Sequence, residues 1–176
     1  MTWECNRASV GGFGMNLDLS NEIALVTGAS RGIGQGIALA LGQAGAKVYG
    51  TATTSGGADS ITQFLSEHGI KGEGKVVDVA DSDSINALVA SLGKKEMPSI
   101  LVNNAGIARD ALLMRMRDDE WNQVVNTNLT GVYRLSKACL RAMMKARHGR
   151  IITITSVVGF TGNPGCDSLA LMRYKI

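Results

Sequence analysis

The chain has 176 residues, of which 45% are hydrophobic and 19% charged, and its net charge is +3. These values fit one globular domain with a single core, and the small positive charge does not favour nucleic acid as a partner. No apolar run reaches the length of about 18 residues that a membrane span needs. Cys5, Cys139 and Cys166 are too far apart for a zinc site or a disulfide framework. We therefore expect a cytoplasmic protein with no bound metal and no membrane partner.

Short apolar segments alternate with helical ones from Glu22 onward. The pattern predicts strands over 23–28, 46–53, 75–79, 99–106 and 150–156. It predicts helices over 32–45, over 58–69, from Asp81 or Ser82 to Leu92, and over 118–146 with a break near Thr130-Gly131. Such alternation is typical of right-handed crossovers, so we expect an α/β fold with a doubly wound parallel sheet of about five strands.

Apolar spacing on the predicted helices indicates which faces are buried. The expected buried residues of the first helix are Ile33, Ile37, Ala40, Leu41 and Ala44, followed by Gly45 as a stop signal. Those of the second are Ile61, Phe64 and Leu65, and those of the third are Ile85, Leu88, Val89 and Leu92.

The segment TGASRGIG, with Gly28, Gly32 and Gly34, follows a predicted strand and opens a predicted helix. Glycines at such a turn let a ligand approach the backbone, and the helix N-terminus offers free N–H groups to a phosphate. A plain glycine-rich turn is the alternative. A P-loop is excluded, because no Gly-Lys-Ser/Thr follows.

TGASRGIG, NNAGIARD and SVVG, in this order, resemble the short-chain dehydrogenase/reductase family. LLMRM, the segment from EWNQVVNTN to SVVG, and GNPG are similar to the bacterial 3-oxoacyl-(acyl-carrier-protein) reductases within it. The resemblance covers residues 15–165 and implies a Rossmann-type domain. It also implies a homotetramer that uses NADPH to reduce a 3-oxoacyl thioester on acyl carrier protein in fatty-acid elongation. A short-chain reductase of another carbonyl compound is the alternative.

The second predicted strand ends without the acidic residue that usually binds the ribose of NAD. Arg31 in the glycine loop can instead pair with a 2′-phosphate and Thr53 can add a hydroxyl, which favours NADP(H). Otherwise Arg31 is a solvated loop residue. The resemblance implies that Asp78 lies at the adenine; otherwise it caps the next helix. The predicted cofactor-binding residues are Gly28, Ser30, Arg31, Gly32, Ile33, Gly34, Thr53, Asp78, Val79, Asn104, Ala105 and Gly106.

Two residues are assigned to catalysis by the resemblance. Asn128, within the long helix, would interrupt that helix and hold a water of a proton relay. Ser156, expected to end the fifth strand, would donate a hydrogen bond to the substrate carbonyl. The alternatives are an ordinary buried polar residue and a strand-end hydroxyl with other partners.

The tyrosine and lysine of the family reaction are expected at Leu169 and Arg173, counted from Ser156. Leucine has no proton to give, and arginine lacks the compact ammonium. Tyr174 and Lys175 are adjacent and would project about 100° apart on a helix. We therefore expect an impaired, truncated reductase whose sheet is incomplete at its C-terminal side. A non-catalytic NADP-binding fragment is the alternative.

The ends of the chain depart from the family pattern. Residues 1–14 are expected to be a disordered extension, residues 15–165 the dinucleotide-binding domain, and residues 166–176 a divergent tail. A basic cluster lies near the end of the long helix. It either complements the helix C-terminus or docks an acidic carrier protein, and its members are Arg141, Lys145, Arg147, His148 and Arg150.

Overall fold

The structure is a computed structural model that describes residues 17–109 and 113–156. The predicted extension over 1–14, the tail over 166–176, Leu169 and Arg173 lie outside the described residues. In the described part of the chain, no helix is long and apolar enough to cross a bilayer.

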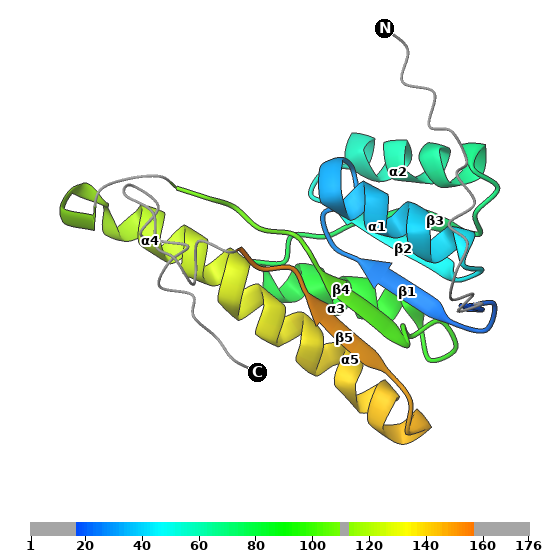
Figure 1. The fold of residues 1–176 in the computed structure, drawn as a ribbon. Helices are drawn as coiled ribbons and strands as arrows, with labels where there is room; N and C mark the ends of the chain where they lie inside the picture. Colours follow the sequence, from blue (N-terminus) through cyan, green and yellow to red (C-terminus); the bar gives the residue numbers. More distant parts are fainter. Residues whose placement is uncertain (1–16, 110–112, 157–176) are drawn as a thin grey trace, which may run out of the picture.

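Five parallel strands form one sheet in the order β3-β2-β1-β4-β5 (Figure 1). β1 is the middle strand: β2 and β3 follow on one side of it and β4 and β5 on the other, so the strand order reverses between β1 and β4. This is the arrangement of a Rossmann-type fold, in which ligands bind beyond the carboxyl ends of the strands at that reversal. The predicted α/β fold is thereby confirmed. The strands are β1 (Ile23–Val26), β2 (Lys47–Ala52), β3 (Gly72–Val76), β4 (Ile100–Asn103) and β5 (Arg150–Thr153).

Helices cover both faces of the sheet (Figure 1). α1 (Gly32–Gln43) and α2 (Ser55–Glu67) pack on one face, where Val26, Val48 and Val102 are buried. α3 (Ser82–Leu92) and α5 (Val132–Ala146) pack on the other, with Leu25 and Leu101. A short 3₁₀ turn (Leu113–Arg115) precedes α4 (Asp118–Val125). Each face of the sheet thus has its own apolar core.

The buried face of α1 differs from the prediction. Ile33 is 66% exposed, and Ala40 is exposed as well. Gly34 and Ala38 are the buried residues, and Ile37 and Leu41 pack partly against the core. The reason is close packing: a side chain at Gly34 would overlap the backbone of Gly28. The helix therefore turns its smallest residues, rather than its largest, toward the sheet.

β3 and α2 both begin three residues before their predicted starts. β3 pairs through GEGKV, because Gly74 passes directly under the backbone of α2, where a side chain would not fit. The apolar Val77 and Val79 follow the strand rather than end it. α2 starts at Ser55 because the Thr54 hydroxyl accepts a hydrogen bond from the Gly57 N–H at 3.2 Å. The glycines of its first turn thus did not prevent a helix.

The long helical stretch is continuous instead of broken near Thr130-Gly131. α4 runs into a π-helical turn, η2 (Asn126–Gly131), which runs into α5. The two α-helices follow one line in Figure 1. A π turn widens the helix by one residue per turn and is frequent at functional sites. The sequence therefore predicted the region of the irregularity correctly, but the irregularity is a π turn and not a break in the helix.

Candidate functional site

A cavity of about 820 Å³ lies at the carboxyl ends of β1 to β4. Its lining comes mainly from the segments that follow these four strands, and also from the end of α4 and the start of the π turn. Every residue assigned to the cofactor from the sequence lies in this lining: Gly28, Ser30, Arg31, Gly32, Ile33, Gly34, Thr53, Asp78, Val79, Asn104, Ala105 and Gly106. The fold thus brings four distant segments to one site.

The glycine loop between β1 and α1 is built for close approach. Gly28 and Gly32 have φ angles of 65° and 59°, which side chains disfavour. No atom lies within 4 Å of the position that a Cβ of Gly32 would take, so this side of the loop is open. Arg31, the N-cap of α1, makes no side-chain capping hydrogen bond. The first N–H groups of α1 are therefore available to an anionic ligand.

The end of β4 is bonded to the glycine loop. The Asn104 side-chain N–H donates to the carbonyls of Thr27 at 2.9 Å and Gly28 at 3.1 Å. The buried Thr27 hydroxyl accepts from the N–H groups of Asn104 and Ala105, both at 2.9 Å. All described hydrogen bonds of Asn104 thus go to Thr27 and Gly28 and fix the geometry of the glycine loop. Its side chain is a structural part of the cavity wall.

The cavity lining contains few charged side chains. Among the described residues that form it, Arg31 is the one cation and Asp78 the one carboxylate. The end of β2 contributes Thr51, Thr53 and Thr54, with no acidic residue among them. A phosphate near Arg31 would meet a guanidinium and hydroxyl groups without a nearby carboxylate at the β2 end.

Asp78 lies in the turn after β3 and not in the strand, contrary to the prediction. Its carboxylate accepts from the Ala80 N–H at 2.9 Å, and its own N–H donates to the Ser84 hydroxyl at 2.9 Å. Asp81, in turn, is the N-cap of α3 and accepts from the N–H groups of Asp83 and Ser84. The predicted alternative, Asp78 as the helix cap, is wrong: that role belongs to Asp81.

Asn128 lies in the π turn and bonds the loop after β4. Its Oδ1 accepts from the Ile107 N–H at 2.8 Å, and its Nδ2 donates to the Ile107 carbonyl at 2.7 Å. The side chain thus holds Ile107, which lines the cavity, against the long helix. Ser156 lies three residues beyond the last residue of β5, so it does not end the strand as predicted.

Several residues of the lining were not identified from the sequence. They include Ile107, Gln123, Asn126 and Thr127. Asn126 and Thr127 belong to the π turn, and the sequence signal for them was the polar segment NTN inside an otherwise amphipathic helix. Gln123, one turn earlier, carries no such signal.

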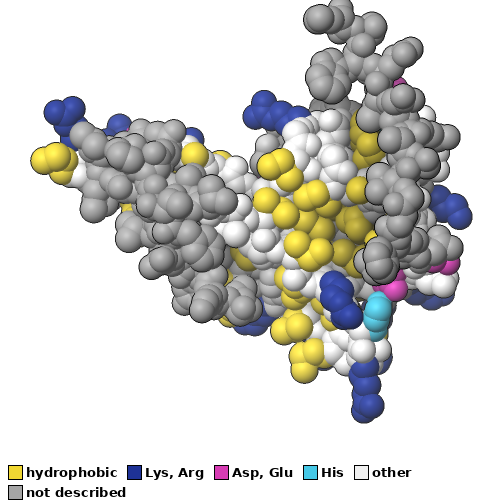
Figure 2. Space-filling model, in the orientation of Figure 1, with side chains coloured by type: hydrophobic (Ala, Val, Ile, Leu, Met, Phe, Trp, Pro, Cys, Tyr) yellow, Lys and Arg dark blue, Asp and Glu magenta, His cyan; other side chains and the backbone are white. Residues whose placement is uncertain are grey.

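A second, open cavity of about 380 Å³ lies between α5 and β5. Leu140 and Met144, 44% and 68% exposed, line it together with Arg147, His148 and Arg150. In Figure 2, basic side chains lie beside the hydrophobic patch of this face. α5 ends in a Schellman-type motif, in which Arg147 takes a left-handed φ of 51°. Basic and apolar side chains therefore meet at one exposed groove.

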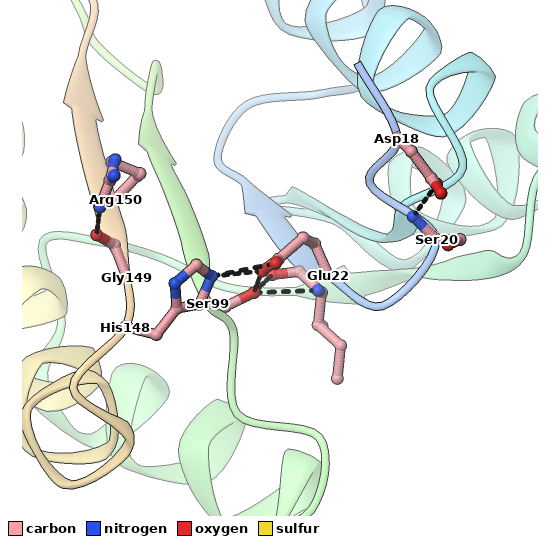
Figure 3. A network of polar contacts seen from close by, with 8 residues as sticks. Asp18, Ser20, Glu22, Ser99, His148, Gly149 and Arg150 are labelled. Carbon is pink, nitrogen blue, oxygen red and sulfur yellow. Dashed lines mark hydrogen bonds and ion pairs between the residues drawn. The ribbon is translucent and has the colours of Figure 1, made fainter. Parts of the chain in front are cut away.

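His148 is paired across the fold, as Figure 3 shows. Its Nε2 lies 2.9 Å from Glu22 Oε1, and the Ser99 hydroxyl donates to Glu22 Oε2 at 2.5 Å. The Ser99 hydrogen bond, then the His148 contact, hold the pKa of Glu22 below its usual range. Because the hydroxyl and the imidazole both face the carboxylate, this is a link between β1, β4 and the α5–β5 turn and not a nucleophilic triad.

The described residues contain no cluster of three potential metal ligands among His, Cys, Asp and Glu.

Comparison with known proteins finds relatives that are named as 3-oxoacyl-(acyl-carrier-protein) reductases. The chain is 57% identical over 158 residues to the 3-oxoacyl-(acyl-carrier-protein) reductase FabG of Pseudomonas aeruginosa. It is 55% identical over 161 residues to the reductase of the same name from Escherichia coli K12. In both cases the match covers 89% of this chain and 64% of the relative, so the chain spans less than two thirds of their length.

The fold also matches a solved structure. A protein assigned to the short-chain alcohol dehydrogenases, from Sinorhizobium meliloti 1021, has a TM-score of 0.81 and 34% sequence identity. The match covers 87% of this chain and 61% of that one. The family model described as short chain dehydrogenase matches residues 22–168. Because this match extends over most of the sequence, the chain belongs to the short chain dehydrogenase family.

Proposed function

We propose that the cavity at the carboxyl ends of the strands binds NADP(H), and that the protein is by family a reductase of 3-oxoacyl thioesters on acyl carrier protein. The observation that carries the proposal is that the glycine loop with Arg31, the end of β2 and Asn104 all line one cavity. The reductases FabG that share 55–57% identity support the substrate class.

The chain's own groups have separate tasks in this proposal. The first N–H groups of α1 bind the pyrophosphate, and Arg31 with Thr53 binds the 2′-phosphate. Asp78 lies beside the adenine. The cofactor, when bound, supplies a hydride to the substrate carbonyl carbon. Ser156 donates a hydrogen bond to the carbonyl oxygen, and Asn128 belongs to the path by which a proton reaches that oxygen.

This chain lacks the expected proton donor of the family reaction. Leu169 and Arg173 stand where the resemblance expects a tyrosine and a lysine. A positioned general acid typically contributes about 10²–10⁴-fold to a rate. We therefore propose cofactor binding with strongly reduced turnover. The second candidate function, a non-catalytic NADP-binding protein, is favoured by the same two residues.

The groove between α5 and β5 is the proposed docking site for the acyl carrier protein. Its lining combines the basic Arg147 and Arg150 with the apolar Leu140 and Met144. A groove with basic and apolar side chains suits an acidic partner that also buries apolar surface.

The proposal places the protein in the cytoplasm as a homo-oligomer. The exposed apolar residues Trp121, Leu129 and Tyr133 of the long helix lie outside the docking groove and support self-association, since large apolar side chains on a helix surface are often buried by a partner. Light scattering at several protein concentrations tests this. A monomer at all concentrations contradicts it.

Titration calorimetry with NADPH and NADH, followed by NADPH oxidation assays, tests the function. We expect NADPH to bind more tightly than NADH. We expect slow oxidation with an acetoacetyl thioester on acyl carrier protein, and less with small ketones. Absence of NADPH binding would refute the cofactor assignment. Binding without any turnover would select the non-catalytic candidate, and turnover that prefers small ketones would select another carbonyl substrate.

A further inference from the structure

The turn after β3 is held from the outside by the long helix. The Ala80 carbonyl accepts a hydrogen bond from Arg134 Nη1 at 2.8 Å and a second from Asn126 Nδ2 at 3.1 Å. The same guanidinium nitrogen lies 3.4 Å from Asn126 Oδ1. One carbonyl of the cavity wall is thus fixed by two side chains from a helix 46 and 54 residues further along the chain.

A third contact from the same helix acts on the same turn. A Cβ added to Gly131 would lie 2.6 Å from the Val79 carbonyl oxygen, so the helix backbone and the turn are in direct contact. Within the turn, the Asp78 carboxylate and carbonyl accept only from the N–H groups of Ala80 and Asp81 in the described structure. The Asp78 N–H is held from α3 by the Ser84 hydroxyl, and the far side of the turn, at Val79 and Ala80, is held by the π turn and α5.

The structure assigns to Arg134 the role of a positioning residue for this wall of the cavity. Arg134 is not part of the cavity lining, whereas Ala80 and Asn126 are. Its influence on a ligand must therefore pass through the Ala80 carbonyl and through Asn126, the two lining residues that it contacts. Arginine suits the task, because it stays charged at all physiological pH values and can donate to two acceptors from one planar group. This inference rests on the proposed binding of NADP(H).

The order of the strands indicates which part of the ligand is affected. If Arg31 and Thr53 bind the 2′-phosphate, the adenosine half lies over β2 and its neighbour β3. The turn held by Arg134 follows β3, so it contacts the adenosine half. Each half of such a sheet serves one mononucleotide. A displaced turn should therefore weaken adenosine 2′,5′-bisphosphate as much as NADPH.

The experiment uses the full chain and titration calorimetry with both ligands, at a temperature where circular dichroism shows each variant folded. Arg134→Met is expected to raise both dissociation constants about tenfold, the effect of losing a hydrogen bond from a charged group. Arg134→Lys, which keeps the charge and one donor, should recover most of the affinity. Lys137→Met, at an exposed lysine on the same helix and outside the cavity lining, should change neither constant.

Gly131→Ala displaces the same turn without touching Arg134 and should give the same paired loss, which keeps the test decisive if Arg134→Met does not fold. Unchanged dissociation constants in folded Arg134→Met or Gly131→Ala would overturn the inference, even if their melting temperatures fall. A loss for NADPH without one for adenosine 2′,5′-bisphosphate would also overturn it. Failure of the unsubstituted chain to bind either ligand would refute the proposed function instead.

Discussion

A Cβ added to Gly34 would lie 2.5 Å from Asn104 Nδ2 and would overlap the Gly28 carbonyl. Helix α1, the glycine loop and the end of β4 are therefore packed without space for a single methyl group. The same Asn104 nitrogen donates to the Gly28 carbonyl. Gly34 therefore packs against both the donor and the acceptor of this hydrogen bond. This junction fixes the loop that would face the phosphates.

Gly34→Ala should lower the free energy of unfolding by about 1–3 kcal/mol and weaken NADPH binding, because the loop must move to admit the methyl group. The matched control is Gly36→Ala in the same helix, where nothing lies within 4 Å of the added Cβ. That change should raise stability by up to about 1 kcal/mol through helix propensity. Urea unfolding measures both variants. Equal effects of the two substitutions would contradict the packing argument.

Arg31→Ala should weaken NADPH by roughly 10- to 150-fold, the range for loss of a hydrogen bond to a charged group of about 1.5–3 kcal/mol. NADH, which has no 2′-phosphate, should lose far less. Lys94→Ala, an exposed lysine outside the cavity, serves as the control for general charge effects. Calorimetric titration decides the matter. If both cofactors weaken equally, Arg31 does not distinguish them.

Glu22→Gln should reduce stability at neutral pH by about 1–2 kcal/mol. The folded state lowers the pKa of Glu22, chiefly through the Ser99 hydroxyl and then through His148. A lowered carboxyl pKa stabilises the fold above the unfolded pKa of about 4.3, and this contribution is lost as the pH falls through the folded value. The difference from the unsubstituted chain should therefore be largest above about pH 5 and shrink in acid.

Urea unfolding at a series of pH values checks this dependence. Asp59→Asn, on the exposed side of α2, is the matched control and should change stability little at neutral pH. A Glu22→Gln difference that stays constant down to pH 3 would show that the carboxylate charge is not what stabilises the link.

Asn128→Asp should destabilise the protein by about 1–3 kcal/mol and weaken cofactor binding. The carboxylate can still accept from the Ile107 N–H, but it faces the Ile107 carbonyl with no donor. Asn122→Asp, an exposed position on α4, is the control. Thermal unfolding with and without NADPH measures both quantities. Identical behaviour of the two variants would show that the Asn128–Ile107 hydrogen bonds do not support the cavity wall.

Arg147→Asn should lower the affinity for an acidic acyl carrier protein several-fold while leaving stability almost unchanged. Asparagine tolerates the left-handed conformation that Arg147 adopts, so the substitution removes the charge and keeps the helix end. Arg147→Lys should bind normally, and the difference between the variants should shrink at high salt. NMR titration measures the affinity. An unchanged affinity for Arg147→Asn would move the docking site elsewhere.

The sequence by itself determined the alternation of strands and helices and the position of the glycine loop. These are local properties: hydrophobic period, capping side chains such as Asp81, and glycines with positive φ all act within a few residues. The fold class follows, because parallel strands joined by helices have few arrangements open to them. The prediction was wrong where packing overrides local preference, as at Ile33 and at the start of β3.

Only the tertiary structure decided which polar groups meet. Arg134 and Ala80 are 54 residues apart, and Asn128 and Ile107 are 21 apart, so no local pattern connects them. The sequence predicted a helical stretch over 118–146 but could not show that a π turn places Asn126 in the cavity lining. The wall of the site is therefore set by long-range contacts, which depend on how the long helix packs across the sheet and not on any single segment.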